Sequence, residues 1–189
     1  MIPQLLLLTG APASGKTTLA VRLARRYRAC VCSKDEIKEL LFDTLGTRER
    51  EGSRALSDAS FAVLFAFAGR LLCAQRLLLL EGNFRPGEHE AAIAAALPAG
   101  VAEFAQVLCR ADAASSESRL AARAADPERH PGHRDQELAA SPRRASGFLD
   151  LSGPRWQFDS DAAGDASWLT LCREVDQWCA NPPQPAHKQ

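Results

Sequence analysis

The stretch QLLLLTGAPASGKT, residues 4–17, decides the fold class of this chain. Residues 4–9 form an apolar run of the kind found in a strand that is buried on both faces. Residues 10–17 satisfy the pattern G-x-x-x-x-G-K-[ST], and a helix is predicted to follow over about 15–28. A strand, a glycine loop and a helix in this order predict a phosphate-binding loop.

The spacing of the glycines and the lysine suits a bound triphosphate. Glycines let the backbone curl so that several N–H groups point at the phosphates, and the start of the helix adds the positive end of its dipole. Lys16 is predicted to contact the β- and γ-phosphates, and the Thr17 hydroxyl is predicted to bind Mg²⁺. The residues expected to hold the nucleotide are Gly10, Ala13, Ser14, Gly15, Lys16, Thr17 and Thr18.

The rest of the chain alternates between short apolar runs and longer amphipathic stretches. Further strands are predicted over residues 30–32, 77–80, 102–109 and 155–158. Further helices are predicted over 33–42, 58–75, 88–96, 112–125, 133–140 and 165–179, with a polar loop over 44–54. Strands that alternate with helices predict an α/β fold, with a parallel sheet covered by helices on both faces.

Length and composition indicate one ordinary domain. The chain has 189 residues, of which 46% are hydrophobic and 24% charged, and its formal net charge is zero. Because this size suits one hydrophobic core, we expect a single domain over 1–180, an arginine-bearing lid at about 112–145 and a disordered tail over 181–189. The zero net charge gives no general attraction to nucleic acid or to a membrane.

The cysteines favour a reducing compartment. None of the six forms a CxxC pair, and most lie in apolar runs, where a free cysteine behaves as a small hydrophobe. Arg70, Gln75 and Arg76 interrupt the apolar stretch 61–80, and the first eight residues lack the charged start of a signal peptide. We therefore expect a cytoplasmic protein with no zinc site and no disulfide framework.

A second group of candidate residues follows the strand predicted at 30–32. Ser33-Lys34-Asp35-Glu36 fits a capping box, so a helix is predicted to start at Ser33. Asp35 and Lys38 are three residues apart and share a helix face near the carboxyl ends of the strands. A carboxylate there can accept a proton from an acceptor hydroxyl, and Lys38 can hold an anionic group of the acceptor. The alternative is that Asp35 only favours the helix dipole and that Lys38 is solvated.

A third group follows the strand predicted at 77–80. Glu81 ends this strand, where a Walker B acid would hold Mg²⁺ or its water shell. Because Walker B usually presents Asp, Asp35 or water is an alternative direct ligand. Asn83 and Arg85 come next and are candidates for binding the acceptor, although Arg85 fits an ordinary surface role equally well.

Two arginines mark the predicted lid. Arg119 and Arg123 are four residues apart on one face of the helix predicted over 112–125. Arginines that close over a transferring phosphoryl group stabilise its charge. A solvated basic helix face is the alternative.

Two histidines of the lid invite a metal interpretation. His130 and His133 have a spacing that zinc sites use, but the sequence offers no evident third ligand. Pro131 and Gly132 also interrupt any helix that would align the two rings. We therefore favour packing or contact with the acceptor for this pair.

Taken together, these segments resemble the small P-loop kinases related to polynucleotide 5′-kinase, chloramphenicol phosphotransferase, gluconate kinase and the zeta-toxin kinases, over about residues 1–160. The resemblance implies a five-stranded parallel sheet in the order 2-3-1-4-5, with ATP and Mg²⁺ as ligands. It implies a general base at Asp35 and an acceptor-phosphate contact at Lys38, where polynucleotide kinases have arginine. A lysine lacks the bidentate fork of arginine. The lid arginine corresponds to Arg119 or Arg123, and spacing does not choose between them.

These patterns favour a phosphotransferase that moves the γ-phosphate of ATP to a hydroxyl of a small-molecule acceptor. A polynucleotide 5′-hydroxyl kinase is the alternative, and a nucleotide-dependent switch or ATPase without an acceptor is an alternative of another class. Acceptor specificity is expected in residues 43–67 and in the loop after Phe84, and adenine contacts are expected near Arg110 and after Asp159.

Overall fold

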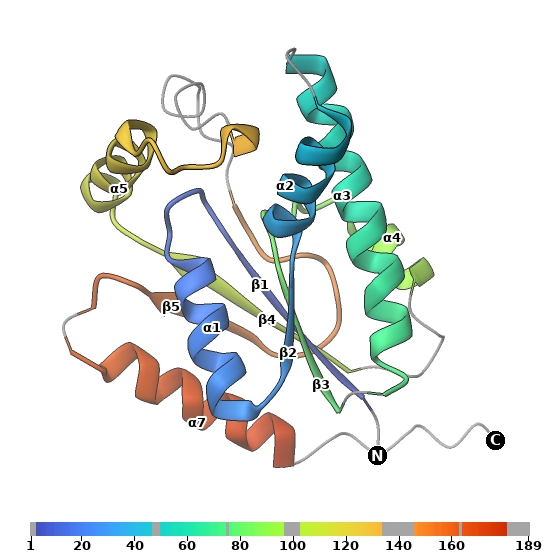
Figure 1. Cartoon of the computed structure of the whole chain (residues 1–189). Helices are drawn as coiled ribbons and strands as arrows, with labels where there is room; N and C mark the ends of the chain where they lie inside the picture. Colours follow the sequence, from blue (N-terminus) through green and yellow to red (C-terminus); the bar gives the residue numbers. More distant parts are fainter. Residues whose placement is uncertain are drawn as a thin grey trace.

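The computed structural model describes residues 3–46, 50–74, 76–96, 103–133, 146–162 and 164–180. Within these ranges strands and helices alternate along the chain (Figure 1). In order they are β1 (Gln4–Gly10), α1 (Lys16–Tyr27), β2 (Cys30–Ser33), α2 (Lys34–Leu45), α3 (Arg50–Leu71), β3 (Leu77–Glu81), α4 (Glu90–Ala96), β4 (Glu103–Arg110), α5 (Ala113–Ala125), the 3₁₀ helix η1 (Pro131–His133), β5 (Arg155–Asp159) and α7 (Ala166–Ala180).

The strands form one parallel sheet in the order β2-β3-β1-β4-β5, which confirms the order 2-3-1-4-5 expected for this fold. In the centre, Leu6 of β1 lies opposite Leu79 of β3 on one side and Ala105 of β4 on the other. Every residue of β1 and β3 is buried, as their continuous apolar sequences predict.

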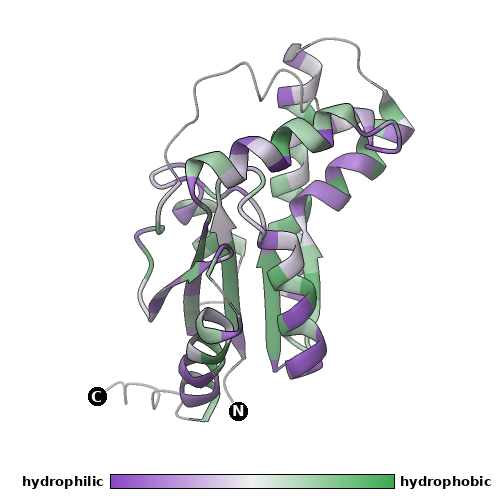
Figure 2. Ribbon diagram, turned by 90° about the vertical axis from the view of Figure 1, so that its left-hand side faces the viewer, coloured by the Kyte–Doolittle hydropathy of each residue, from purple (hydrophilic) through white to green (hydrophobic). Residues whose placement is uncertain are grey.

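Helices cover both faces of the sheet, because successive side chains of a strand point to opposite faces. Leu6 and Leu8 belong to a core cluster shared with α1 and α7. Leu5 and Leu7 belong to a second cluster shared with α3 and α4. Figure 2 shows the central strands as hydrophobic, whereas the helices carry both hydrophilic and hydrophobic residues.

The prediction of a loop over 44–54 was wrong for its second half, because α3 already begins at Arg50. Ser53 and Leu56 lie in the first two turns of α3 and are buried, and the Ser53 hydroxyl accepts a hydrogen bond from Lys38 of α2 at 3.0 Å. Packing against α2 therefore stabilises a helix that the polar sequence of this segment does not favour by itself. Residues 47–49 lie outside the described part of the chain.

The far end of α3 also differs from the prediction, which extended the helix to residue 75. The helix ends at Leu71, and the N–H of Ala74 bonds to the carbonyl of Leu71 at 2.9 Å in a tighter turn. The helix α2 continues to Leu45, three residues beyond its predicted end, and the 3₁₀ helix η1 was not predicted. The remaining described strands and helices begin and end within two residues of their predicted bounds. The helix predicted over 133–140 and the tail 181–189 lie outside the described residues, apart from His133. None of the described helices is long and apolar enough to span a membrane.

Candidate functional site

The loop between β1 and α1 is a tight backbone curl. Gly10, Ala13 and Gly15 have φ angles of 150°, 62° and 87°, and the N–H of Ser14 bonds back to the carbonyl of Ala11 at 3.2 Å. A Cβ atom on Gly10 would lie 2.4 Å from the carbonyl oxygen of Cys109, so only glycine fits there. This close approach follows from the register of β1 and β4, in which Gly10 lies opposite Cys109.

The start of α1 is open to an anion. Gly15 occupies the N-cap without a side-chain hydrogen bond, and the first turn of α1 contains no acidic residue. Thr17 and Thr18 in this turn are exposed. The first N–H groups of a helix lack partners within the helix, and its dipole is positive at that end. This end of α1 therefore provides what phosphate oxygens need.

Lys16 lies buried within the curl. Its ammonium donates a hydrogen bond to the carbonyl of Ala11 at 2.8 Å. Burial lowers the pKa of Lys16, although the negative charges of Glu81 and Asp35 act in the opposite direction. The side-chain oxygen of Ser14 is also buried, with no hydrogen-bond partner among the described residues. A cation in a desolvated loop gains free energy from any anion that enters it.

Asp35 and two lysines of α2 lie beside this loop. The carboxylate of Asp35 is half-exposed and accepts a hydrogen bond from Lys34 at 3.3 Å. Burial would raise the pKa of Asp35, but the positive charges of Lys34, His133 and Lys16 outweigh this effect and lower it. Lys38 is buried and donates to Ser53. The structure thus brings together Lys16 and Asp35, which are far apart in the sequence but were predicted to meet.

Glu81 lies buried at the end of β3, at the same carboxyl edge of the sheet as the phosphate-binding curl and Asp35. Burial raises the pKa of Glu81, whereas the charge of Lys16 and a hydrogen bond from the Ser33 hydroxyl lower it to a smaller extent. That hydrogen bond is 2.7 Å long. The predicted capping box is therefore wrong: Ser33 is the N-cap residue of α2, but its side chain makes no cap bond and binds Glu81 instead. The parallel register places Ser33 directly opposite Glu81, which explains the exchange of partners.

The two predicted acceptor residues after β3 have different surroundings. The Oδ1 atom of Asn83 is buried and has no hydrogen-bond partner within the described residues. The guanidinium of Arg85 pairs with Glu88 at 2.7 Å in a half-exposed ion pair. Arg85 also donates its backbone N–H to the ring of His89 at 2.8 Å. Arg85 is thus held within its own loop rather than against Asp35 or Lys16.

The two arginines of α5 also differ, which spacing alone could not show. Arg119 donates to the Ser160 hydroxyl at 2.8 Å, to Asp161 at 2.5 Å and to the carbonyl of Ala13 at 3.4 Å. It therefore joins the phosphate-binding curl to the loop after β5. Arg123 lies near enough to Lys16 for its charge to lower the pKa of the ammonium further. Figure 1 shows α5 at the same edge of the sheet as the start of α1 and α2.

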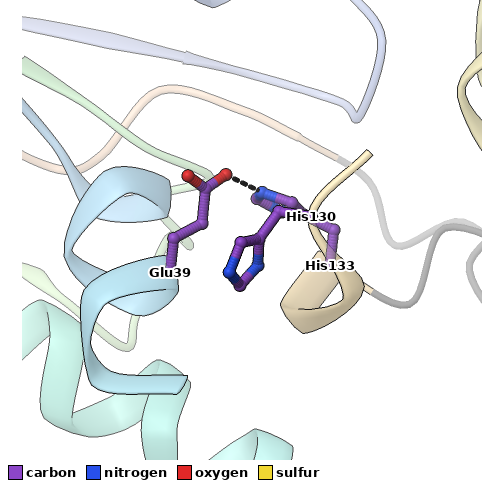
Figure 3. Close-up of side chains that lie close together, drawn as sticks. All are labelled: Glu39, His130 and His133. Atoms are coloured by element: carbon purple, nitrogen blue, oxygen red, sulfur yellow. Dashed lines mark hydrogen bonds and ion pairs between the residues drawn. The ribbon is translucent and has the colours of Figure 1, made fainter. Parts of the chain in front are cut away.

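The two lid histidines contact α2. His130 binds Asp43 at 2.9 Å, and His133 makes a hydrogen bond with Glu39 (Figure 3). The sequence shows no third ligand near the histidines, but the fold brings Glu39 to them as a candidate: one oxygen of Glu39 and one nitrogen of each ring all lie within 4.8 Å of one another. His133 is the last residue of the short 3₁₀ helix Pro131–His133, and His130 directly precedes that helix.

Sequence reasoning missed the role of Lys34 in this arrangement. The chain has four lysines, and Lys16, Lys34 and Lys38 are all buried around the proposed site. Lysine is almost never fully buried without a partner. In a chain whose basic residues are mostly arginine, three lysines inside the two candidate segments were a usable signal.

The sheet order, the curl at 10–17 and the open start of α1 define a P-loop protein with a kinase-like fold. Residues 5–143 match the model of a protein family described as an AAA domain, and the chain belongs to that family.

Solved structures agree with this assignment. A Chloroflexus aurantiacus protein provisionally named as a kinase is 32% identical, with a TM-score of 0.79 over 94% of this chain and 98% of its own. A sugar kinase from a Janibacter species is 12% identical, with a TM-score of 0.63 over 97% of this chain and all of its own. The APS kinase of Mycobacterium tuberculosis, solved with AMPPNP and APS, is 18% identical, with a TM-score of 0.55 over 93% and 98%. The last two show the fold alone. No curated protein matched the chain.

Proposed function

We propose that this protein transfers the γ-phosphate of ATP to a hydroxyl group of a small-molecule acceptor. The observation that carries the proposal is the meeting of Lys16, buried in the phosphate-binding curl, with the half-exposed carboxylate of Asp35. A protein that only binds or hydrolyses a nucleotide needs the first of these groups but has no need of a carboxylate aimed at an acceptor.

Nucleotide binding would begin with an exchange of partners at Lys16. Its ammonium now binds the carbonyl of Ala11, and the β- and γ-phosphates would replace that weak partner with a charged one. The N–H groups of the curl and of the first turn of α1 would bind the remaining phosphate oxygens.

The residues present also fit a Mg²⁺ ion. Thr17 offers an exposed hydroxyl at the start of α1, and Glu81 offers a buried carboxylate of which one oxygen is occupied by Ser33. Mg²⁺ favours such oxygen ligands together with its own waters. Thr17 would hold the ion directly and Glu81 through water, and the ion would neutralise charge on the β- and γ-phosphates.

Asp35 would act on the acceptor. Its lowered pKa keeps the carboxylate ionised at neutral pH, so it can accept a hydrogen bond from the attacking hydroxyl and then its proton. The buried cations of Lys34 and Lys38 beside it favour an acceptor that carries negative charge or electronegative groups near the reacting hydroxyl. Asn83, whose buried oxygen has no hydrogen-bond partner in the described part of the chain, would accept a hydrogen bond from the same molecule.

The two arginines of α5 would have different roles, Arg123 in stabilising the transferring charge and Arg119 in binding ATP, and substitution of each residue tests this. We expect Arg123→Ala to lower kcat by about 10–100-fold with little change in KM for ATP, because Arg123 is near Lys16 and would stabilise the transferring charge. We expect Arg119→Ala mainly to raise KM for ATP, because Arg119 joins the curl to the loop after β5. The two variants remove the same side chain from the same helix, so each is the control for the other. Equal effects on kcat and KM in both variants would contradict the division.

The reaction itself is tested by transfer of labelled γ-phosphate. Purified protein with ATP and Mg²⁺ is incubated with pools of sugars, amino alcohols, nucleosides, antibiotics and oligonucleotides with free 5′ ends, and labelled products are separated from free phosphate. We expect a labelled small molecule from one pool. Label on oligonucleotide ends would instead support a polynucleotide kinase. Labelled phosphate without any labelled acceptor would favour a switch or an ATPase.

A further inference from the structure

The contact between the predicted lid and α2 contains a set of groups that the proposed phosphotransferase reaction does not use. His130 directly precedes η1 and His133 is its last residue, and two carboxylates, Glu39 and Asp43, lie four residues apart on α2. Residues four apart on an α-helix share one face, and a hydrogen bond of 3.3 Å from the N–H of His133 to the carbonyl of His130 closes the turn that carries the two imidazoles. The structure sets the two pairs against each other, so that His130 meets Asp43 and His133 meets Glu39. Figure 3 shows the second of these contacts.

We propose that Glu39, His130 and His133 form a zinc-binding site that joins η1 to α2. One carboxylate oxygen and one nitrogen from each ring lie within 4.8 Å of one another. A tetrahedral zinc ion with bonds of about 2.0–2.2 Å spaces its ligand atoms roughly 3.4 Å apart, so movements of about an ångström would close the site. Two imidazoles with one carboxylate are a ligand set that zinc uses, with the fourth position left to water.

The side chains are already held in place, as a metal site requires. The His133 side chain is only 7% exposed, while those of His130 and Glu39 are 21% and 34% exposed. The edge of the His130 ring packs against Phe42 with centroids 5.4 Å apart. Asp43 takes Nε2 of this ring, so zinc would bind Nδ1 and displace the N–H of Gly132, which donates to Nδ1 at 3.1 Å. Asp43 is the outer carboxylate that orients His130, the arrangement that supports histidine ligands in zinc sites.

The ligand types select the class of cation. Imidazole nitrogen suits zinc and its neighbours among the transition metals, whereas Mg²⁺ and Ca²⁺ prefer sites made of oxygen alone. In the absence of metal, a hydrogen bond between His133 and Glu39 holds the same contact. Zinc would instead join the two segments through its bonds to Glu39, His130 and His133. Because α2 also carries Asp35 and Lys38, the metal would fix the position of η1 relative to the acceptor side of the site.

Zinc binding to the full chain, without an affinity tag and without nucleotide, tests the proposal. In competition with a chromophoric chelator, we expect one zinc ion per chain, an affinity reduced at least about 100-fold in His133→Ala and His130→Ala, and a reduction of about 10-fold in Asp43→Asn. Glu128→Gln removes an exposed carboxylate from the same region and should bind zinc as the unaltered chain does. Unchanged affinity in the double variant His130→Ala/His133→Ala would overturn the site, as would binding no tighter than millimolar.

The six cysteines are the main competitors for zinc, and cobalt distinguishes them without any variant. Cobalt held by two imidazoles and a carboxylate gives weak visible bands, whereas cobalt held by thiolate adds an intense near-ultraviolet charge-transfer band. We expect the first spectrum, and a dominant thiolate band would overturn the assignment. We also expect zinc to slow amide hydrogen exchange both in α2 and in residues 126–133, and protection of neither would overturn the bridging role. Because no nucleotide is present, these results do not depend on the phosphotransferase proposal.

Discussion

Replacing Lys16 with alanine is expected to lower the rate of phosphoryl transfer by at least about 10³-fold. The ammonium is the one cation buried inside the phosphate-binding curl, where a charge interacts with phosphate far more strongly than it would in water. Single-turnover transfer of labelled phosphate, measured with the best acceptor of the screen, gives the effect on the chemical step. Calorimetry with ATP and Mg²⁺ gives the effect on binding.

The variant should fold, and this makes the result interpretable. Burial lowers the pKa of Lys16, so the charged side chain is held at a cost in the absence of nucleotide, and its removal is not expected to lower the melting temperature. Arg22→Ala is a matched control, because it removes a half-exposed cation from the same helix, where Arg22 pairs with Asp165. Arg22→Ala should transfer phosphate at the unaltered rate. If Lys16→Ala retained more than a tenth of the activity, the phosphate-binding role of this loop would be refuted.

Asp35→Asn is expected to lower kcat by about 10²-fold or more while the affinity for ATP changes by less than about threefold. The asparagine keeps the shape of the side chain but cannot take a proton from the acceptor hydroxyl. Glu36→Gln is the matched control, since Glu36 is the next residue of α2 and is exposed. It should leave kcat unchanged. Full activity in Asp35→Asn would remove this carboxylate from the reaction.

The pH profile gives a second test of Asp35. Its pKa in the folded protein is lowered below the ordinary value of 3.8, so the carboxylate form persists above that pH and is lost only as the pH falls through the lowered pKa. Between about pH 5 and pH 8, Asp35 should therefore contribute no acid limb to kcat. An acid limb in this range that disappears in Glu81→Gln would belong to Glu81, whose pKa burial raises.

Much of the fold could be read from individual segments. The continuous apolar runs at 4–9 and 77–80 predicted strands buried on both faces, and the structure buries all of β1 and β3. The start of α3 could not be read in this way. Residues 50–54 are polar, and their helix depends on contacts such as that between Ser53 and Lys38, which involve a partner outside the segment.

In the candidate site, too, single segments predicted which residues lie there but not which residues they contact. The pattern at 10–17 identified the curl, and the order of strands and helices indicated that Asp35 and Glu81 would lie near it. The partners of these residues were not predictable. The Ser33 hydroxyl had two possible partners, the first turn of its own helix and Glu81. The register of β2 against β3 places it opposite Glu81, and it binds that residue.

The sequence by itself determined the phosphate-binding loop, the parallel sheet and the identity of the charged residues at its carboxyl edge, because each depends on local spacing and on the periodicity of apolar residues. Only the tertiary structure decided which of these residues meet. It gave Arg119 and Arg123 different surroundings, and it set Glu39 beside His133, which lies 94 residues away in the sequence. Contacts between distant segments depend on how helices pack on the sheet, and no pattern within a single segment records that packing.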